Sequence, residues 1–211
     1  MTLPSAITVS RMLGSGGTRI ALSVARQLSW HFCDGRILRQ AARELNVPLA
    51  SLREQEERSS GFLEYLLSMS AFASPEVPYA PPPELPVYSK DIFEVESDIM
   101  RRLVERESAV LVGRGGFIAL RDRPATLHVR IEAGLDYRIR HLLATGKAAD
   151  AGAALRAIKI SDHNRTEFCR QAAGIEWTDR RPFHLVLNTE ETSPEQCVQE
   201  IVAEARKRFS L

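Results

Sequence analysis

The chain of 211 residues is 44% hydrophobic and 26% charged, a composition that lets a single domain bury a sizeable core beneath a charged surface. Its 28 Lys and Arg residues are matched by 27 Asp and Glu residues, which argues against a protein that holds nucleic acid through bulk positive charge. Three cysteines without CxxC spacing, and the lack of any run near the ~20 apolar residues of a membrane span, argue against a disulfide framework, a zinc site and a transmembrane protein.

The N-terminal part of the chain predicts two strand–helix units. Residues 6–10 (AITVS) form a short β-prone run, and after a glycine-rich turn residues 18–28 carry apolar side chains at helical spacing. Residues 31–34 (HFCD) are expected to form a second short strand, followed by a helix over 36–45 that ends before Pro48. The first unit therefore has the order strand, glycine loop, helix.

The middle of the chain is rich in proline. Residues 49–73 are expected to be helical, but residues 74–88 hold six of the eleven prolines, which excludes a continuous helix or a central strand there. This proline-rich segment is either a plain extended linker or a mobile flap that contacts a partner. A further helix is expected from Asp91 to about Arg106.

The C-terminal half alternates strands with helices. Apolar runs predict strands at 109–113, 126–131 and 184–187, and helices are expected over 135–145 and 150–172. The strands are apolar throughout rather than alternating, which predicts a parallel sheet with helices on both faces. In such a sheet, ligands bind beyond the carboxyl ends of the strands.

The last helix has a start that can be read from the sequence. Ser193 is a capping residue, Pro194 suits the first helical position and Gln196 the third. The apolar stripe of this helix consists of Cys197, Val198, Ile201, Val202, Ala205 and Phe209.

The glycine-rich turn after the first strand has the features of a phosphate-binding loop. Backbone N–H groups at a helix N-terminus bind phosphate oxygens, the helix dipole adds attraction, and glycine lets the backbone approach closely. We therefore expect a nucleotide-binding loop, with the cofactor-binding residues Gly14, Ser15, Gly16, Gly17, Thr18 and Arg19. The alternative is a glycine-rich turn without a ligand.

Two positions depart from the usual G-x-x-x-x-G-K-[ST] pattern of such loops. The last glycine and the Ser/Thr of the pattern fall on Gly16 and Thr18, but its first glycine falls on Arg11 and its lysine on Gly17. Arg11, at the end of the first strand, and Arg19, which could equally face solvent, are the cations available in place of the lysine. Thr18 is either an ordinary early helix residue or a Mg²⁺ ligand.

The order of several segments resembles a known family. The segments ITVSRMLGSGGTRIA, FCDGRILRQAA, VLVGRGG, SDHNR and LVLNT resemble the cytidylate-kinase-like family, a branch of the nucleoside monophosphate kinases, over roughly residues 6–205 and least over 49–100. The resemblance implies one α/β domain over 1–211, of the P-loop NTPase type, with three α/β/α layers around a mostly parallel five-stranded sheet. It also implies an acceptor-binding excursion over about 35–107 and a lid over about 134–175.

By this resemblance, the acceptor nucleotide binds near the second and third strands. The letters DGRILR loosely match the family's Asp-Ser-Gly-x-x-Tyr-Arg, which implies that Asp34 and either Arg36 or Arg39 bind the acceptor. An exposed helix arginine is the alternative for either of the two. The letters GRG match the family's Gly-Arg-Asp, which implies that Arg114 contacts the acceptor phosphate, while Gly115 replaces the family's Asp.

The family's lid motif, R-x-x-x-D-x-x-R, matches Asp162 and Arg165, and its first arginine falls on Ile158 next to Lys159. The resemblance implies that lid residues close over the transferring phosphate, a common way to stabilise its charge. The alternative is an i,i+3 Asp–Arg pair on a helix surface, worth ~0.2–0.5 kcal/mol. Arg138 lies where these kinases place arginines at the start of the lid helices.

The resemblance implies ATP- and Mg²⁺-dependent transfer of the γ-phosphoryl group to a small phosphorylated acceptor, above all CMP or dCMP. The candidate catalytic residues are Arg11, which would partly replace the lysine, and Lys159, Asp162 and Arg165. The alternatives are a non-catalytic nucleotide-binding or regulatory protein that retains the fold, and a kinase of another small metabolite. The expected partners are small-molecule nucleotides rather than nucleic acid or a membrane. The cysteine usage and the absence of a signal-peptide pattern favour the cytoplasm.

Overall fold

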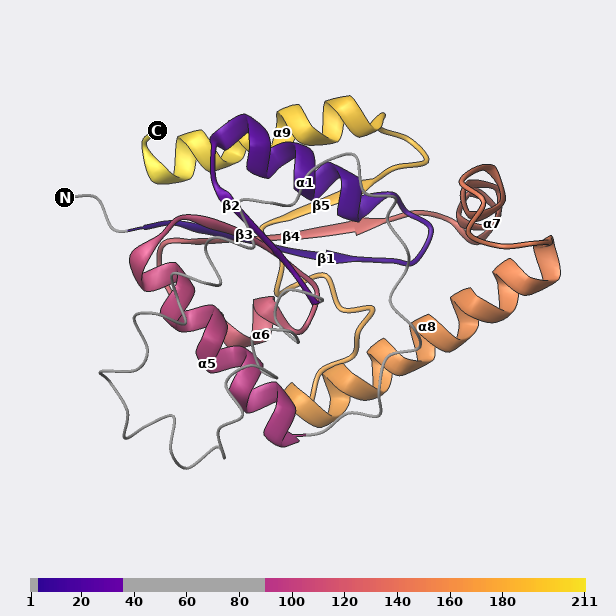
Figure 1. Ribbon diagram of the computed structural model, residues 1–211, viewed down its shortest axis with the longest axis horizontal. Helices are drawn as coiled ribbons and strands as arrows, with labels where there is room; N and C mark the ends of the chain where they lie inside the picture. Colours follow the sequence, from indigo (N-terminus) through magenta and orange to yellow (C-terminus); the bar gives the residue numbers. More distant parts are fainter. Residues whose placement is uncertain (1–3, 36–89) are drawn as a thin grey trace.

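The computed structural model describes residues 4–35 and 90–211 (Figure 1). The helices expected over 36–45 and 49–73, the proline-rich segment 74–88, and the candidate acceptor ligands Arg36 and Arg39 lie outside the described residues.

One sheet of five parallel strands organises the described part of the chain, in the order β2-β3-β1-β4-β5. The strands are β1 (Ala6–Arg11), β2 (His31–Asp34), β3 (Ala109–Val112), β4 (Thr126–Glu132) and β5 (Leu185–Asn188). Each expected strand end lies within one residue of the observed end. The central strand β1 pairs with β3 on one side and β4 on the other, so Ile7 lies between Val110 and Leu127.

Helices cover both faces of this sheet, which confirms the expected three layers (Figure 1). The helices α1 (Gly17–Leu28) and α9 (Pro194–Phe209) lie on one face. The helices α5 (Lys90–Arg106), α6 (Gly116–Ala119) and α8 (Ala151–Ala173) lie on the other. Because both faces are covered, every residue of β3 and β4 is buried. The strand β3 is apolar throughout as expected, but the expectation is wrong for β4, in which apolar residues alternate with four buried polar or charged residues, Thr126, His128, Arg130 and Glu132.

The core has one apolar cluster on each face of the sheet. Val24 of α1 and Ile201 of α9 pack with Ile7 on the first face, and Leu103 of α5 packs with Leu111 on the second. Each such fully buried side chain contributes about 1.5–3 kcal/mol through the hydrophobic effect. The expected start of α9 is confirmed, because the Ser193 hydroxyl accepts a hydrogen bond from the Gln196 amide at 3.2 Å in a capping box.

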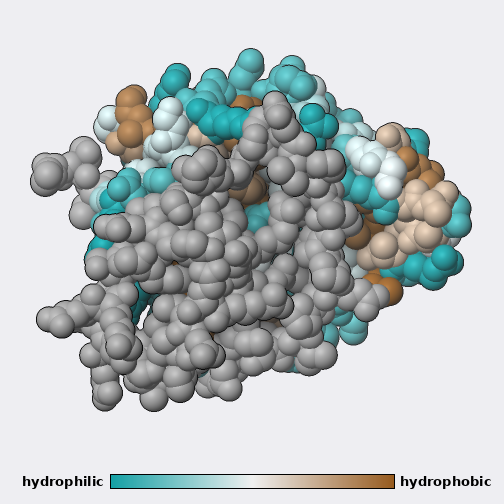
Figure 2. Space-filling view, in the orientation of Figure 1, coloured by the Kyte–Doolittle hydropathy of each residue, from teal (hydrophilic) through white to brown (hydrophobic). Residues whose placement is uncertain are grey.

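The helix α7 (Leu135–Ala144) follows β4 and lies beyond the carboxyl ends of the strands (Figure 1). It forms a hairpin with α8 across a turn at residues 145–150. Its exposed side chains include Leu135 and Leu143. Figure 2 shows apolar surface at the right-hand end of the molecule, where Figure 1 places α7. No helix within residues 4–35 and 90–211 combines the length and the apolar character that crossing a membrane requires.

Two stacked histidines connect β4 with the segment that leads into β5. The His128 and His184 rings stack with centroids 5.1 Å apart, and the Thr8 hydroxyl lies 2.7 Å from Nδ1 of His128. Burial, together with the neighbouring His184 and Arg208, lowers the pKa of His128 from 6.5 to about 4. The imidazole is therefore neutral in the folded protein near neutral pH.

This depressed pKa predicts acid sensitivity. Above its ordinary pKa of 6.5, His128 is neutral in both states and adds no pH dependence; below 6.5 the unfolded chain binds the proton first. The free energy of unfolding should therefore fall by roughly 3 kcal/mol between about pH 7 and about pH 4. Urea unfolding across this range should show a flatter pH dependence in His128→Gln than in a His163→Gln control, whose histidine is exposed. Identical slopes in the two variants would show that His128 is not the responsible group.

Candidate active site

The candidate site lies where the central strand ends. From β1 the chain first adds β2, beyond β3 on one side, and later β4 and β5 on the other side. The carboxyl end of β1 is therefore the switch point of the sheet, where a crevice for ligands is expected in open parallel sheets. Residues 12–16 connect β1 to α1 at this point.

Glycine is required in this loop by backbone conformation and by contact with α7. Gly14 and Gly16 have φ angles of +86° and +74°, which side chains rarely allow. A Cβ on Gly14 would lie 2.8 Å from both Cβ and the carbonyl oxygen of Arg138. The loop is thus packed tightly beneath α7.

Four amides of the loop are available to a ligand. Within the described part of the chain, the N–H groups of Gly14, Gly16, Gly17 and Thr18 donate no hydrogen bond to the protein. Ser15 differs, because its amide and its hydroxyl donate to the Met12 carbonyl oxygen at 3.3 and 2.9 Å. Free amides at the start of a helix are the arrangement that binds anions, so the loop stays a candidate anion site.

The loop is also tied to the end of the last strand. The buried hydroxyl of Thr189 donates to the Ser15 carbonyl oxygen at 2.9 Å. This bond directs the Ser15 carbonyl away from the anion site toward the segment after β5. The polar groups of Ser15 are therefore used within the protein to shape the loop, and the amides free to bind a cofactor belong to the neighbouring glycines and Thr18.

Arg11 occupies the volume into which a side chain at position 17 would grow. A Cβ on Gly17 would lie 2.7 Å from Cβ and 3.3 Å from Cγ of Arg11, and 3.2 Å from Cβ of Ile131. The Arg11 side chain then passes Thr18, whose hydroxyl lies 3.5 Å from Nε, and its guanidinium lies beside Gly113 at the end of β3. A lysine at position 17 would therefore collide with Arg11, whose side chain already brings a positive charge to this part of the loop.

The candidate acceptor residues lie at the ends of β2 and β3. Asp34 is buried at the end of β2, and Arg114 has a φ of +51° just after β3. The Arg114 guanidinium pairs with the fully buried Glu96 of α5, at 2.7 Å from Nε and 2.6 Å from Nη2 to Oε2. Burial, Asp34 and Glu96 all raise the pKa of the Cys33 thiol, which keeps it neutral. Glu96 was not expected from the sequence.

Aromatic rings explain why the family's Asp is absent at position 115. A Cβ on Gly115 would lie 2.7 Å from the Phe93 ring and 2.8 Å from the Phe168 ring. The two rings meet edge to face with centroids 5.2 Å apart. This contact joins α5 to α8 over the glycine, and a side chain at position 115 would have to displace the rings and adopt a φ of +67°.

The candidate residues on α8 take part in a network centred on Asp162. Asp162 receives two hydrogen bonds from Arg138, at 3.0 Å from Nη1 and 2.7 Å from Nη2, whereas Arg165 lies 4.0 Å away. The Arg165 guanidinium lies 5.5 Å from the centre of the buried Trp177 ring. Lys159 is exposed on α8. The i,i+3 pair that is the alternative to the lid interpretation is present at 4.0 Å, but the principal partner of Asp162 is Arg138 on α7.

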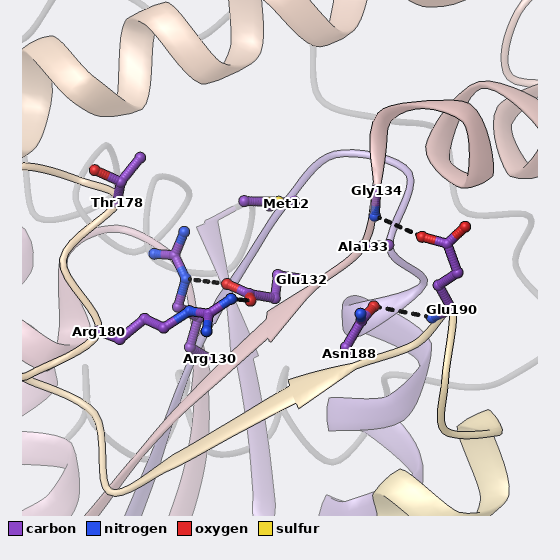
Figure 3. Close-up of a pocket in the computed structure, with 9 residues that line it drawn as sticks. All are labelled: Met12, Arg130, Glu132, Ala133, Gly134, Thr178, Arg180, Asn188 and Glu190. Carbon is purple, nitrogen blue, oxygen red and sulfur yellow. Dashed lines mark hydrogen bonds and ion pairs between the residues drawn. The ribbon is translucent and has the colours of Figure 1, made fainter.

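A cavity of about 370 Å³ opens at the ends of β4 and β5 (Figure 3). Arg130, which is buried, donates from Nε to Glu132 at 2.9 Å, and Arg180 pairs with the same carboxylate. Glu190 accepts a hydrogen bond from the Gly134 amide at 3.1 Å on the opposite side of the cavity. Neither Glu132 nor Glu190 was predicted as a site residue. Glu132 could have been, because it directly follows the expected strand over 126–131 and a carboxylate at a strand end is a signal for a site.

Thr18 is the candidate Mg²⁺ ligand of this loop, and its hydroxyl supplies a single oxygen. The described residues contain no group of three or more His, Cys, Asp or Glu side chains arranged for a metal ion. The Thr18 hydroxyl is available, but Arg11 lies 3.5 Å from it. Since Mg²⁺ keeps several waters and binds phosphate oxygens readily, one hydroxyl is compatible with a metal held mainly by the nucleotide.

Comparisons with known proteins agree with this geometry. The family model described as the cytidylate kinase-like family matches residues 6–191. An uncharacterized protein from Eubacterium ventriosum has a similar structure, with a TM-score of 0.67 and 17% identity over 95% of this chain and 98% of that chain. A sugar kinase from Janibacter sp. has a TM-score of 0.50 and 13% identity over 95% of this chain and 93% of that chain. At such identities the likeness concerns the fold, and a search of the curated proteins gives no match.

The tight contact beneath α7 can be tested with a pair of glycine variants. Gly146 has a φ of +65° and no atom within 4 Å of a built Cβ, so Gly146→Ala carries backbone strain alone, roughly 1 kcal/mol. Gly14→Ala adds overpacking against Arg138 and should lower the free energy of unfolding by a further 1–3 kcal/mol or so, roughly the cost of forced core packing. Equal losses in chemical denaturation would mean that α7 does not press on the loop in solution.

Proposed function

Because the chain belongs to the cytidylate kinase-like family, we propose that it transfers the γ-phosphoryl group of ATP to a nucleoside monophosphate, with CMP or dCMP as the first acceptors to test. The observation that carries this proposal is the set of four free amides of Gly14, Gly16, Gly17 and Thr18 at the start of α1. These amides are a site for the donor phosphates, because they meet an anion with hydrogen-bond donors and the positive end of a helix dipole.

Phosphoryl transfer requires positioning and positive charge rather than covalent participation by the protein. Arg11 supplies that charge in our proposal, since its guanidinium lies between Thr18 and the end of β3, beside the free amides. A preorganised cation at this place would stabilise the charge on the transferring group. Mg²⁺, when bound, would neutralise charge on the donor phosphate oxygens, with Thr18 as its protein ligand.

The acceptor would bind on the β2–β3 side of Arg11. Asp34 and Arg114 lie at the carboxyl ends of these two strands, and Glu96 fixes the direction of the Arg114 guanidinium. An arginine held in this way is oriented for a phosphate and loses little side-chain freedom on binding. Arg36 and Arg39 are further proposed acceptor ligands from outside the described residues.

The α7–α8 hairpin would act as the lid. Arg165 lies near the half-buried Asp162 and the buried Trp177, and in our proposal its guanidinium turns from there toward the transferring group. Asp162 acts on this network by holding Arg138 over the loop. Lys159 is exposed and would reach phosphate only after movement of α8.

The reaction would take place in the cytoplasm. Cys33, Cys169 and Cys197 are buried free thiols, a state that a reducing compartment preserves.

Turnover can be measured through coupled release of ADP. With ATP and Mg²⁺, CMP or dCMP should give the highest kcat/KM in a panel of nucleoside monophosphates and other small acceptors. A higher kcat/KM for a different small metabolite would keep the phosphotransferase and replace the acceptor. ATP binding without turnover of any acceptor would identify a non-catalytic nucleotide-binding protein that retains the fold. The glycine in place of the lysine at position 17 is the feature that favours this alternative.

Substitutions at positions 11 and 17 test the source of the positive charge. Arg11→Ala should lower kcat/KM by roughly 10²–10³-fold, the range seen when one charge-stabilising donor is lost. Gly17→Lys alone should also lose activity and stability, because its Cβ meets Cβ of Arg11 at 2.7 Å. The double variant Arg11→Gly/Gly17→Lys removes that contact, leaves Ile131 Cβ at 3.2 Å as the nearest atom, and should recover most of the activity.

Two outcomes contradict this assignment. Higher activity of Gly17→Lys than of the natural chain would mean that Arg11 does not replace the lysine. A folded double variant no more active than Arg11→Ala would mean that charge at position 17 cannot serve this loop. Thermal unfolding of all three variants separates these results from misfolding.

A further inference from the structure

A buried tryptophan from the segment between α8 and β5 has no role in the scheme above. Trp177 is 5% exposed and forms an apolar cluster with Phe117 of α6 and Cys169 of α8. Met12, the first residue of the loop between β1 and α1, packs against the same cluster. The cluster that contains Trp177 therefore reaches the candidate anion site.

Trp177 is fastened to the sheet by a buried arginine. Arg130 of β4 is 2% exposed, and its Nη1 donates a hydrogen bond to the Trp177 carbonyl oxygen at 2.6 Å. The same guanidinium lies 4.6 Å from the centre of the Trp177 ring, so it holds both the backbone and the side chain of this residue. Glu132 balances the buried charge, since it accepts a hydrogen bond from Nε of Arg130 at 2.9 Å (Figure 3). The indole thus has a fixed place relative to β4.

The same ring lies against a cation of α8. The guanidinium carbon of Arg165 is 5.5 Å from the centre of the Trp177 ring, within the distance of about 6 Å over which an aromatic face attracts a cation. The side chain of Arg165 is only 16% exposed, so water screens this attraction weakly. A cation on a ring face keeps its N–H groups for hydrogen bonds, because the ring attracts the charge and uses none of the donors.

The contacts of Arg165 with its own helix cannot fix its place relative to the sheet. Nη1 donates to the Ser161 carbonyl oxygen at 3.2 Å, and Asp162 lies 4.0 Å from the same nitrogen. Both partners belong to α8 and move with Arg165 whenever this helix moves. Trp177 belongs to a different segment, which Arg130 ties to β4. The ring contact therefore relates the position of Arg165 to the strand ends.

We propose that Trp177 is the positioning residue of Arg165: its ring holds the guanidinium beside the strand ends, and the guanidinium stays on the ring as it turns toward the transferring phosphoryl group. The inference rests on the proposed function, which gives Arg165 its part in catalysis. An arginine held in this way loses little side-chain freedom in the transition state, so the ring contributes to kcat rather than to binding of the donor. A residue outside the lid motif thus sets the orientation of a residue within it.

Substitutions of Trp177 test the ring separately from its bulk. Trp177→Met, with a flexible apolar side chain, should lower kcat roughly tenfold through loss of a desolvated cation–ring contact. The KM for ATP should not change, because the donor phosphates are proposed to bind the loop amides. Trp177→Phe retains a ring and should recover most of kcat. The matched control Trp30→Met removes the other tryptophan, which packs on the opposite face of the sheet, and should lower stability but leave kcat unchanged.

A double-mutant cycle with Arg165 distinguishes positioning from general packing. In an Arg165→Ala background there is no guanidinium to hold, so adding Trp177→Met should lower kcat no further. If Trp177 serves only the packing of its cluster, the same loss appears in both backgrounds. Thermal unfolding of each variant checks that the assays compare folded proteins.

Fluorescence tests the contact without a substitution at Trp177. The chain has two tryptophans, so Trp30→Phe leaves Trp177 as the only one. In that background Arg165→Ala should change the intensity of the Trp177 emission, because a charge leaves the ring. Arg156→Ala removes an exposed arginine from the same helix and should leave the emission unchanged. This measurement decides the question even where Trp177→Met does not fold.

The outcomes separate this inference from the proposed function. A natural chain that transfers phosphate, with equal effects of Trp177→Met in both backgrounds or with Trp177 emission indifferent to Arg165→Ala, would overturn the positioning role and leave the kinase proposal standing. A natural chain without turnover of any acceptor would overturn both. A loss of kcat that Trp177→Phe restores, and that disappears in the Arg165→Ala background, would support the inference.

Discussion

The exclusion of a side chain at position 17 by Arg11 is the constraint on which the site depends. A Cβ on Gly17 would lie only 2.7 Å from Cβ of Arg11, which is too close for two carbon atoms. This loop can therefore carry a positively charged side chain at position 11 or at position 17, but not at both. The chain carries it at the end of β1 instead of the start of α1. As a result, the guanidinium of Arg11 lies across the strand ends beside Gly113 at the end of β3, whereas a side chain at position 17 would extend from the first residue of α1. The two departures from the usual loop pattern, arginine in place of its first glycine and glycine in place of its lysine, are therefore coupled by this contact.

A second consequence follows from the close packing of α7. Gly14 and Gly16 lack side chains at the two places where Arg138 and His141 approach, so the same glycines that expose the loop amides also admit the helix above them. Thr189 holds the loop from the β5 side through the Ser15 carbonyl oxygen. The anion site is thus bounded by elements from distant parts of the chain, and its shape depends on the whole carboxyl edge of the sheet.

Local patterns in the sequence are sufficient for the strands and for most of the helices. Apolar runs such as residues 109–112 are buried on both faces, and Ser193 with Gln196 forms the cap that the residue types indicate. The glycine-rich turn between β1 and α1 can also be predicted, because its glycines and Thr18 are adjacent in sequence. The partners that shape the site are not, since Glu96 lies 18 residues from Arg114 and Asp162 lies 24 residues from Arg138. Such pairs depend on how α5 and the α7–α8 hairpin dock, and neither charge nor spacing in the sequence reveals that docking.

Gly115 also has a mechanical consequence. By leaving room for Phe93 and Phe168 to touch, it joins α5, beside the β2–β3 side of the sheet, directly to the far half of α8. If α8 swings away from the sheet, the ring contact must break or α5 must follow. A movement of α8 away from the sheet is therefore coupled to α5 through this ring contact, and the size of the residue at position 115 decides whether the two rings can meet.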